Sequence, residues 1–198
     1  MDAETARSID GVFRALDREL WVVTAAHGAK RGGLVATWIS QTSLDSATPR
    51  VVAGLAPNHH TTELVLASGA FGLHLLAARH MPLVWRFAIG SGRDRDKLAE
   101  LATTNVVTGS PILGDCVAWL DCRVIHHIDA GDRFFFWADV MAGARREDER
   151  PIREQEALAT ADPAKLEALR DDREADIALQ RPMAETWLRS IGLIEVPR

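Results

Sequence analysis

The sequence predicts a mainly β protein: a closed or nearly closed antiparallel β-barrel of about six strands, with peripheral helices and a C-terminal helical extension. Short β-branched and aromatic runs recur between turn residues, which is typical of strands. Most connections between these runs are short, which favours antiparallel neighbours and a barrel. The charge density then rises, because 19 of the 37 positions from 145 to 181 are Asp, Glu, Lys or Arg. We therefore expect a folded barrel over residues 1–144 and a charged helical extension over residues 145–198.

Length and composition limit the class of protein. The 198 residues, 47% of them hydrophobic, fit one domain with an appendage. A net charge of −5 without a basic block argues against nucleic acid as the main partner. No apolar run reaches the roughly 18 residues of a membrane-spanning helix, and the first residues lack the basic and apolar parts of a signal peptide. We expect a cytoplasmic protein that contacts neither nucleic acid nor a membrane.

The first half of the chain predicts a helix followed by four strands. Apolar residues three and four positions apart, from Ile9 to Leu20, predict an amphipathic helix that docks on the barrel. Gly32 and Gly33 form the expected turn of a first hairpin, and Gly69 ends a short helix over residues 61–68. The strands are expected at residues 20–26, 34–42, 50–56 and 70–77.

The second half predicts a long hairpin and then the extension. Residues 81–101 have an irregular helical pattern, in which an aspartate caps a stretch at 94–102. A strand over 116–128 has apolar even positions and places Asp121 on its wetter face, and residues 133–141 return as its partner. Asp162-Pro163 and Pro182 each predict the start of a helix. The apolar stripes of these two helices need burial on the barrel or on a second subunit: Leu166, Leu169 and Ile177, and Met183, Trp187 and Ile191.

The cysteines and histidines do not indicate a metal or redox site. Cys116 and Cys122 lie about 20 Å apart on one expected strand, too far for a disulfide, and are expected to be buried small hydrophobes. The adjacent histidine pairs at 59–60 and 126–127 would point to opposite faces of a strand and cannot chelate one ion together. The chain also lacks a P-loop, a strand-borne GxGxxG, GxSxG and HExxH.

A polar segment at the end of the second expected strand is the first candidate site. Neutral donors beside an indole suit a phosphate, a ribityl chain or another polyol, and the indole can lie against an aromatic ring. The alternative is an edge strand whose polar face meets water, and the residues alone favour that alternative. The candidate residues are Thr37, Trp38, Ile39, Ser40, Gln41, Thr42 and Ser43.

A second candidate follows at the start of the short helix. Asn58, His60 and Thr61 lie where free N–H groups of a helix N-terminus favour an anion such as phosphate. A plain capping role for the Thr61 hydroxyl explains the pattern equally well.

Taken together and in this order, these segments resemble the flavin reductase-like, FMN-binding split-barrel family. The 38–43 segment is most similar to members that accompany flavodiiron proteins or act as small electron-transfer flavoproteins. The resemblance covers about residues 12–144 and rests on residues 20–25, 38–43, 49, 58–64, 68–73, 109–113, 120–124 and 131–132.

The resemblance implies an FMN-binding barrel, with FAD as the alternative flavin. It also implies a homodimer with each flavin near the subunit interface. By position, residues 37–42 would line the flavin ring and ribityl chain, and Ser43 would continue that wall. Asn58, His60 and Thr61 would lie near the phosphate, and Phe87 would approach the flavin from the other side. No catalytic side chain is implied, because the cofactor carries the redox chemistry.

One position departs from the family pattern. Many members have Gly-Asp-His at the last hairpin, whereas this chain has Gly131-Asp132-Arg133. An arginine there could hold a nucleotide phosphate or could mark the loss of NAD(P)H reductase activity.

The expected function is an FMN-dependent oxidoreductase of the flavin reductase type. It would pass electrons from NAD(P)H through bound FMN to free flavin, a partner protein or a small acceptor. The first alternative is an FMN-binding electron-carrier module without its own NAD(P)H site. The second is a split barrel that binds another planar ligand.

Overall fold

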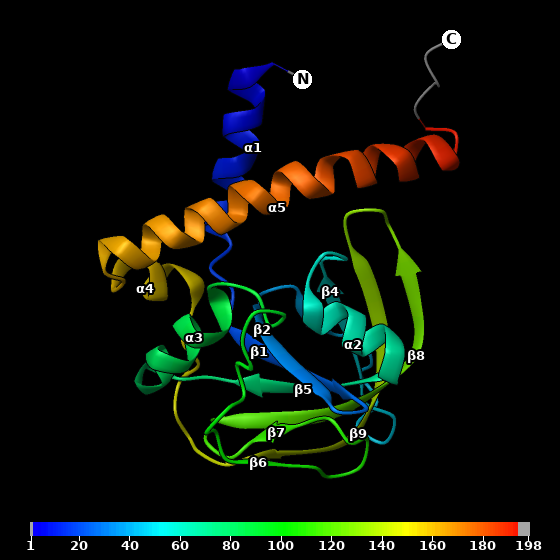
Figure 1. Ribbon diagram of the computed structural model, residues 1–198, viewed down its shortest axis with the longest axis vertical. Helices are drawn as coiled ribbons and strands as arrows, with labels where there is room; N and C mark the ends of the chain where they lie inside the picture. The colour runs from blue at the N-terminus through cyan, green and yellow to red at the C-terminus, as the bar shows by residue number, and fades with distance from the viewer. Residues whose placement is uncertain (1, 194–198) are drawn as a thin grey trace.

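The computed structural model, which describes residues 2–193, contains one curled seven-stranded antiparallel sheet with helices around it (Figure 1). The strands are β1 (Trp21–His27), β2 (Lys30–Ala36), β3 (Ile39–Gln41), β4 (Arg50–Leu55), β5 (Ala70–Leu75), β8 (Ala118–Asp129) and β9 (Phe134–Arg145), with β6 (Thr103–Thr104) and β7 (Ile112–Leu113) forming a separate pair. The helices are α1 (Ala3–Ala15), α2 (His60–Ser68), the 3₁₀ turn η1 (Ala78–His80), α3 (Met81–Ala88), α4 (Glu154–Ala159) and α5 (Pro163–Ser190).

The sheet closes into a split barrel at one short joint of the chain. Its strand order is β2-β1-β5-β8-β9-β4-β3, so β2 and β3 form the two edges. Only Thr37 and Trp38 separate these edge strands along the chain. Three peptide units span at most about 11 Å, so the sheet must curl to bring its edges together. The mainly β barrel with peripheral helices is confirmed, but the single strand predicted over 34–42 is wrong, because the chain leaves one edge and joins the other at this joint.

The first hairpin turns earlier than predicted. Its turn lies at Gly28 and Ala29, where Gly28 has a φ of 58°, and β2 then begins at Lys30. Gly33 lies inside β2 instead, where a Cβ atom would come within 2.6 Å of the Phe87 ring. A glycine is therefore needed here for the close approach of α3 to the sheet, and the predicted turn at Gly32-Gly33 is wrong.

Two hydrophobic clusters hold the fold together. The first fills the barrel interior under α2 and includes Val23, Phe71 and Phe136. The second lies where the opposite face of β1 meets α3 and α4, and it includes Phe87 and Ile152. Neighbouring residues of β1 belong to different clusters, because successive side chains of a strand point to opposite faces.

Both cysteines belong to these clusters, as predicted. Cys116 and Cys122 are unpaired and at most 1% exposed. Burial raises the pKa of the Cys116 thiol to about 11 and raises that of Cys122 further. The two thiols are therefore packing residues.

The long β8–β9 hairpin departs from the predicted alternation. Its pairing register shifts between Asp121 and Cys122 and again between Val124 and His126, which breaks a strict inside–outside pattern. Asp121, predicted on the wetter face, is fully buried, and its carboxylate accepts N–H bonds of 2.8 and 2.9 Å from Val107 and Thr108. Beyond Val124 the side chains of β8 are exposed, and the hairpin projects past the barrel (Figure 1).

Two helical predictions need correction. The segment at 94–102 forms turns instead of a helix. Helix α1 forms, with Asp2 as its N-cap, but it buries none of its residues and stands away from the barrel (Figure 1). Its apolar stripe therefore remains exposed, with Val12 and Phe13 more than half accessible. The predicted docking of this helix on the barrel of the same chain is wrong.

The part of the extension after Asp162 forms one long helix where the sequence predicts two. Helix α5 begins at Pro163 behind an Asp162 cap, as predicted, but it continues through Pro182 to Ser190. In the view of Figure 1 it runs above the barrel, from α4 to the tip of the β8–β9 hairpin. Contact there is close, because a Cβ atom on Gly131 would lie 2.7 Å from the Met183 carbonyl oxygen and from Trp187 Cβ.

The apolar stripes of α5 are only partly covered. Leu166, Leu169 and Trp187 are half-buried, whereas Ile177 and Met183 are exposed. No helix within residues 2–193 is long and apolar enough to cross a membrane.

Candidate functional site

The joint between β2 and β3 presents an indole ring on the surface. Trp38 is 46% exposed. Its carbonyl oxygen accepts the Gly54 N–H at 2.8 Å, and a Cβ atom on Gly54 would meet the indole at 3.2 Å. The guanidinium carbon of Arg133 lies 4.9 Å from the indole ring centroid, at cation–π distance. We call this region, the joint at Thr37 and Trp38 together with Arg133, the seam of the barrel. The seam thus combines accessible aromatic surface with a cation.

Helix α5 is bonded directly to this seam. Arg133 Nη1 donates to Gln180 Oε1 at 2.7 Å, and Gln180 Nε2 donates to Asn58 Oδ1 at 3.0 Å. Gln180 is only 7% exposed. One amide side chain therefore connects the tip of the β8–β9 hairpin to the loop between β4 and α2.

A carboxylate of α5 lies one helical turn before this amide. Asp176 Oδ1 accepts from Asn58 Nδ2 at 2.6 Å, and its Oδ2 lies 2.8 Å from His59 Nε2, so that nitrogen carries the proton in this contact. Two donors of the β4–α2 loop thus already bind an anionic group, which α5 supplies from the same chain.

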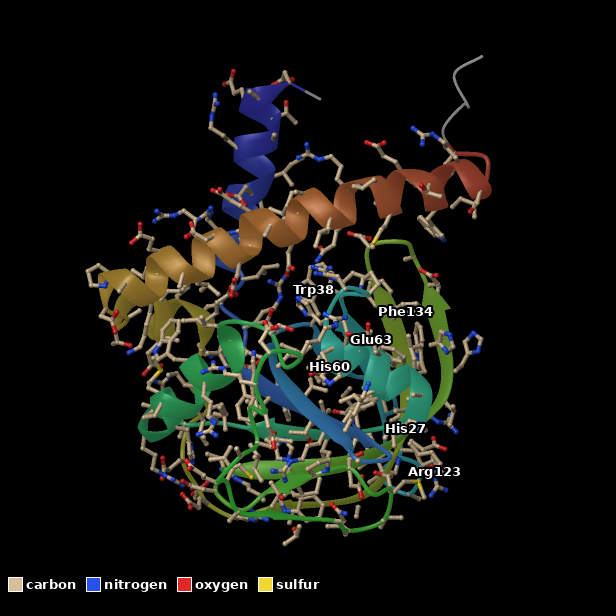
Figure 2. All side chains as sticks on the ribbon, in the orientation of Figure 1. His27, Trp38, His60, Glu63, Arg123 and Phe134 are labelled. Carbon is tan, nitrogen blue, oxygen red and sulfur yellow. The ribbon has the colours of Figure 1, made fainter. Side chains whose placement is uncertain are left out.

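A second ion pair lies beside the loop. Arg93 donates to the Asn58 carbonyl oxygen at 2.9 Å and to Glu63 Oε1 at 2.6 Å, while His60 Nδ1 lies 3.3 Å from Glu63 Oε2. The Arg93 guanidinium holds the pKa of the Glu63 carboxyl below its usual range. Figure 2 shows His60 and Glu63 on α2, below Trp38 and α5.

Some of the charged side chains in this region have an ion-pair partner, and one does not. Arg93 pairs with Glu63, and His59 lies against Asp176. Arg133, in contrast, has no carboxylate at ion-pair distance within the described part of the chain. Burial partly dehydrates the charge and lowers the pKa of its guanidinium, while the nearby charges of Asp132 and Asp176 act in the opposite direction. Arg133 is therefore a cation that an incoming anion could pair with.

The polar segment continues from the indole along β3. Thr37 and Ser43 are half-buried, Ile39 packs against the barrel cluster, and the side chains between them are exposed. Gln41 Nε2 donates to the Ser43 carbonyl oxygen at 2.6 Å. The exposed neutral donors and acceptors of this edge are Ser40, Gln41 and Thr42.

Two of the predicted site residues are buried. The N-cap of α2 is His59, not Thr61, and Thr61 is 2% exposed and packs near Gly32 of β2. Phe87 is 1% exposed and fills the second hydrophobic cluster behind Gly33. The structure therefore brings Trp38, Asn58 and His60 into one bonded region, while Thr61 and Phe87 support β2 from within the protein.

The residues from α5 were missed by sequence reasoning, although a signal existed. Asp176 and Gln180 are four positions apart, a spacing that places two side chains on one helix face. The predicted buried stripe instead included Ile177, which is 42% exposed. The face of α5 that meets the barrel here is polar.

The donor set fits a flavin nucleotide. The indole offers a face for a flat ring, the β3 edge offers neutral groups for hydroxyls, and Arg133 offers a charge for a phosphate. Among the residues that the structure describes, no group of three or more His, Cys, Asp or Glu side chains could hold a metal ion.

A family comparison agrees with this chemistry. Residues 13–159 match the flavin reductase like domain, and the protein therefore belongs to the flavin reductase-like family of FMN-binding split barrels. Helix α5, with Asp176 and Gln180, lies outside the matched segment.

Two curated proteins with similar sequences are much longer than this chain. A diflavin flavoprotein A from Nostoc sp. is 30% identical over 139 residues, which are 70% of this chain and 24% of that protein. Another from Synechocystis sp. is 28% identical, over 74% of this chain and 24% of its own length. The chain thus spans about a quarter of the curated relatives that it matches.

Solved structures share the fold. Nitrilotriacetate monooxygenase component B from Mycobacterium thermoresistibile has a TM-score of 0.66 and 24% identity, and the match covers 77% of this chain and 83% of that one. An NADH:FAD oxidoreductase from Streptomyces globisporus has a TM-score of 0.67 and 20% identity, covering 76% and 89%. An FMN-binding protein from Thermus thermophilus has a TM-score of 0.61 and 22% identity, covering 66% and 73%.

Proposed function

We propose that this protein is an FMN-dependent oxidoreductase of the flavin reductase type. It passes electrons from NAD(P)H through bound FMN to free flavin, a partner protein or a small acceptor. The observation that carries the proposal is the seam at Trp38, where an exposed indole lies beside neutral polar groups and an unpaired Arg133. FMN combines a flat ring, a hydroxylated chain and a phosphate, so each part has a chemical counterpart here. The names of the FMN-binding and NADH:FAD oxidoreductase neighbours support this choice.

When bound, the flavin supplies the redox chemistry by taking up a hydride and passing its electrons on. The residues of this chain bind and orient it. Trp38 would cover the ring, side-chain or main-chain groups of Ser40, Gln41 and Thr42 would bond to the hydroxylated chain, and Arg133 would offer positive charge. The chemistry requires no protein acid or base, which agrees with a site whose carboxylates Glu63 and Asp176 are already engaged.

The second candidate function is an FMN-binding electron-carrier module without an NAD(P)H site. It is favoured by the curated relatives, which are diflavin flavoproteins that this chain matches over about a quarter of their length. It is also favoured by Arg133, which stands where many family members have a histidine.

The spectrum of the purified full chain tests both candidates. A flavoprotein absorbs at about 450 nm, and extraction followed by chromatography tells FMN from FAD. Bleaching by NADH or NADPH without oxygen supports the reductase, and bleaching only by dithionite supports the carrier. A colourless protein that takes up neither added flavin refutes both.

Site variants locate the flavin. Trp38→Ala is expected to weaken FMN binding about tenfold, since a stacked aromatic ring contributes on the order of 1 kcal/mol or more. Leu44→Ala, at a fully exposed position of the following loop, is the matched control and should bind as the wild type does. Equal FMN affinities for the wild type, Trp38→Ala and Leu44→Ala would show that the flavin does not bind at the seam.

We further propose that the protein is a homodimer in the cytoplasm. The exposed stripe of α1, with Val12 and Phe13, and the exposed Ile177 and Met183 of α5 support the dimer, because apolar patches of this kind favour a protein partner. The two unpaired cysteines suit a reducing compartment. Light scattering should give twice the chain mass for the wild type and a shift towards monomer for Phe13→Glu. A monomeric wild type refutes the dimer.

A further inference from the structure

We propose that Arg133 is the anion-recognising residue of the seam, and that Gln180 is the positioning residue that holds it over Trp38. The ligand chemistry is a phosphate joined to a flat aromatic ring. Two sources share it: the phosphate of FMN and the phosphates of the nicotinamide nucleotide. The inference rests on the proposed function and assigns a role to α5, the helix outside the family match.

The hydrogen bonds of Arg133 leave part of its guanidinium available. Its Nη1 donates to the Asp132 carbonyl oxygen and to Gln180 Oε1, both at 2.7 Å. Within residues 2–193, its Nε and Nη2 groups have no protein acceptor. Arginine pairs with phosphate through two N–H groups at once, and the Nε–Nη2 edge has this geometry.

The position of the guanidinium indicates where the anionic group of a ligand would lie relative to its flat ring. It lies 4.9 Å from the centroid of Trp38, an indole that is 46% exposed. Arg133 itself is half-buried, and its Nε and Nη2 atoms are not among the fully buried polar atoms without a partner. A ligand that covers the indole with a flat ring therefore brings any attached anion close to this cation.

Gln180 is suited to position a cation without neutralising it. It is the one buried residue of α5, and both ends of its amide are bonded, to Arg133 and to Asn58. Because the NH₂ group of Gln180 donates to Asn58, the amide oxygen of Gln180 is the atom that faces the Arg133 guanidinium. A neutral acceptor orients Arg133 and leaves its charge for the ligand, whereas a glutamate in this position would form an ion pair with it.

The nearest carboxylate of α5 is held elsewhere. Asp176 is bonded to Asn58 and His59 and makes no ion pair with Arg133. Asp132, the other acidic neighbour, contacts Arg133 through its main-chain oxygen. Neither carboxylate forms an ion pair with the guanidinium, although the negative charges of both act on it from nearby.

The principal test compares FMN with riboflavin, which has the same ring and no phosphate. The variants are Arg133→Gln, Arg133→Lys and the near-isosteric Gln180→Glu, with Arg170→Gln as the control at an exposed arginine of α5. Arg133→Gln and Gln180→Glu should lower the preference for FMN over riboflavin at least tenfold, since a charge-assisted hydrogen bond is roughly twice as strong as a neutral one. Arg133→Lys should keep part of the preference for FMN, and the control Arg170→Gln should keep all of it.

The same proteins distinguish the source of the phosphate. If the nicotinamide nucleotide supplies it, the FMN preference stays unchanged, while KM for NADH or NADPH rises about tenfold at unchanged kcat. Adding Gln180→Glu to Arg133→Gln should change nothing more, because Gln180 acts through Arg133. Equal weakening of FMN and riboflavin, or no change in either flavin preference or KM, overturns the proposal.

A flavin-free measurement separates this inference from the proposed function. Inorganic pyrophosphate should raise the melting temperature of the wild type and of Arg170→Gln, but not that of Arg133→Gln or Gln180→Glu. If the wild type binds no flavin, the proposed function fails while this shift still supports an anion site. The absence of any shift in the wild type, together with unchanged ligand preferences, refutes the anion site itself.

Discussion

Lowering the pH from 7 to 4 should destabilise the fold through one buried histidine, His74 of β5. Its side chain is fully buried between two backbone groups. Nδ1 donates to the Val22 carbonyl oxygen at 3.0 Å, and Nε2 accepts the Leu113 N–H at 3.0 Å. Protonation of Nε2 would place two N–H groups face to face in an apolar interior. The folded protein therefore favours the neutral ring.

The magnitude follows from the pKa. Burial lowers the pKa of His74 from 6.5 to about 4. Because the neutral form is favoured in the fold, the contribution is complete above pH 6.5 and is lost as the pH falls towards 4. The full loss is about 3 kcal/mol, at 1.36 kcal/mol for each pH unit between the two pKa values. A loss of this size is a large fraction of the 5–15 kcal/mol that roughly describes a folded domain.

Urea unfolding at intervals between pH 7 and pH 4 measures this loss. The variant His74→Gln cannot titrate there, so its stability should fall about 3 kcal/mol less than that of the wild type over this range. His126→Gln, at an exposed histidine, is the control and should follow the wild type. If His74→Gln does not fold, NMR titration of the wild-type His74 Cε1–H should give a midpoint near 4. Parallel pH profiles for His74→Gln and wild type, or a midpoint above 6, would refute the reasoning.

Three further predictions concern the hairpin and the core. Gly131→Ala should destabilise the contact with α5 by about 2 kcal/mol, because its Cβ would lie 2.7 Å from Trp187 Cβ at a φ of 83°; hydrogen exchange along α5 measures this. Asp121→Asn should lower the free energy of unfolding by about 2 kcal/mol, since the carboxylate accepts two N–H bonds in a buried site; urea unfolding measures it. The Cys116 thiol should resist a disulfide reagent at pH 8 until the protein unfolds, since burial raises its pKa to about 11.

Matched controls accompany these changes. Gly28 also has a positive φ but has nothing within 4 Å, so Gly28→Ala should show the backbone effect alone. An equal effect at Gly28 and Gly131 would contradict close packing of α5. Asp171→Asn, at an exposed position, should leave stability unchanged, and a similar loss there would contradict a special role for Asp121. Rapid native labelling would contradict the burial of Cys116.

The sequence alone predicted the features that depend on local patterns. The β-branched runs at 20–26, 50–56 and 70–77 became strands β1, β4 and β5, because strand formation there follows residue type and period. The Asp162-Pro163 pair predicted the start of α5, because a cap and a proline act within one helical turn. The ordered segments also predicted the split-barrel family correctly.

Only the tertiary structure decided which residues meet at the candidate site. The break at Thr37-Trp38 follows from the pairing of β3 with β4 at the far edge of the sheet, which no local pattern encodes. Gln180 is buried because it finds an arginine and an asparagine from two distant segments, so burial of a polar side chain depended on partners unknown from its own helix. The interior position of Phe87 likewise depended on the space left by Gly33 on a neighbouring strand. Such contacts join residues tens of positions apart, and the physical properties of each segment by itself are compatible with other partners.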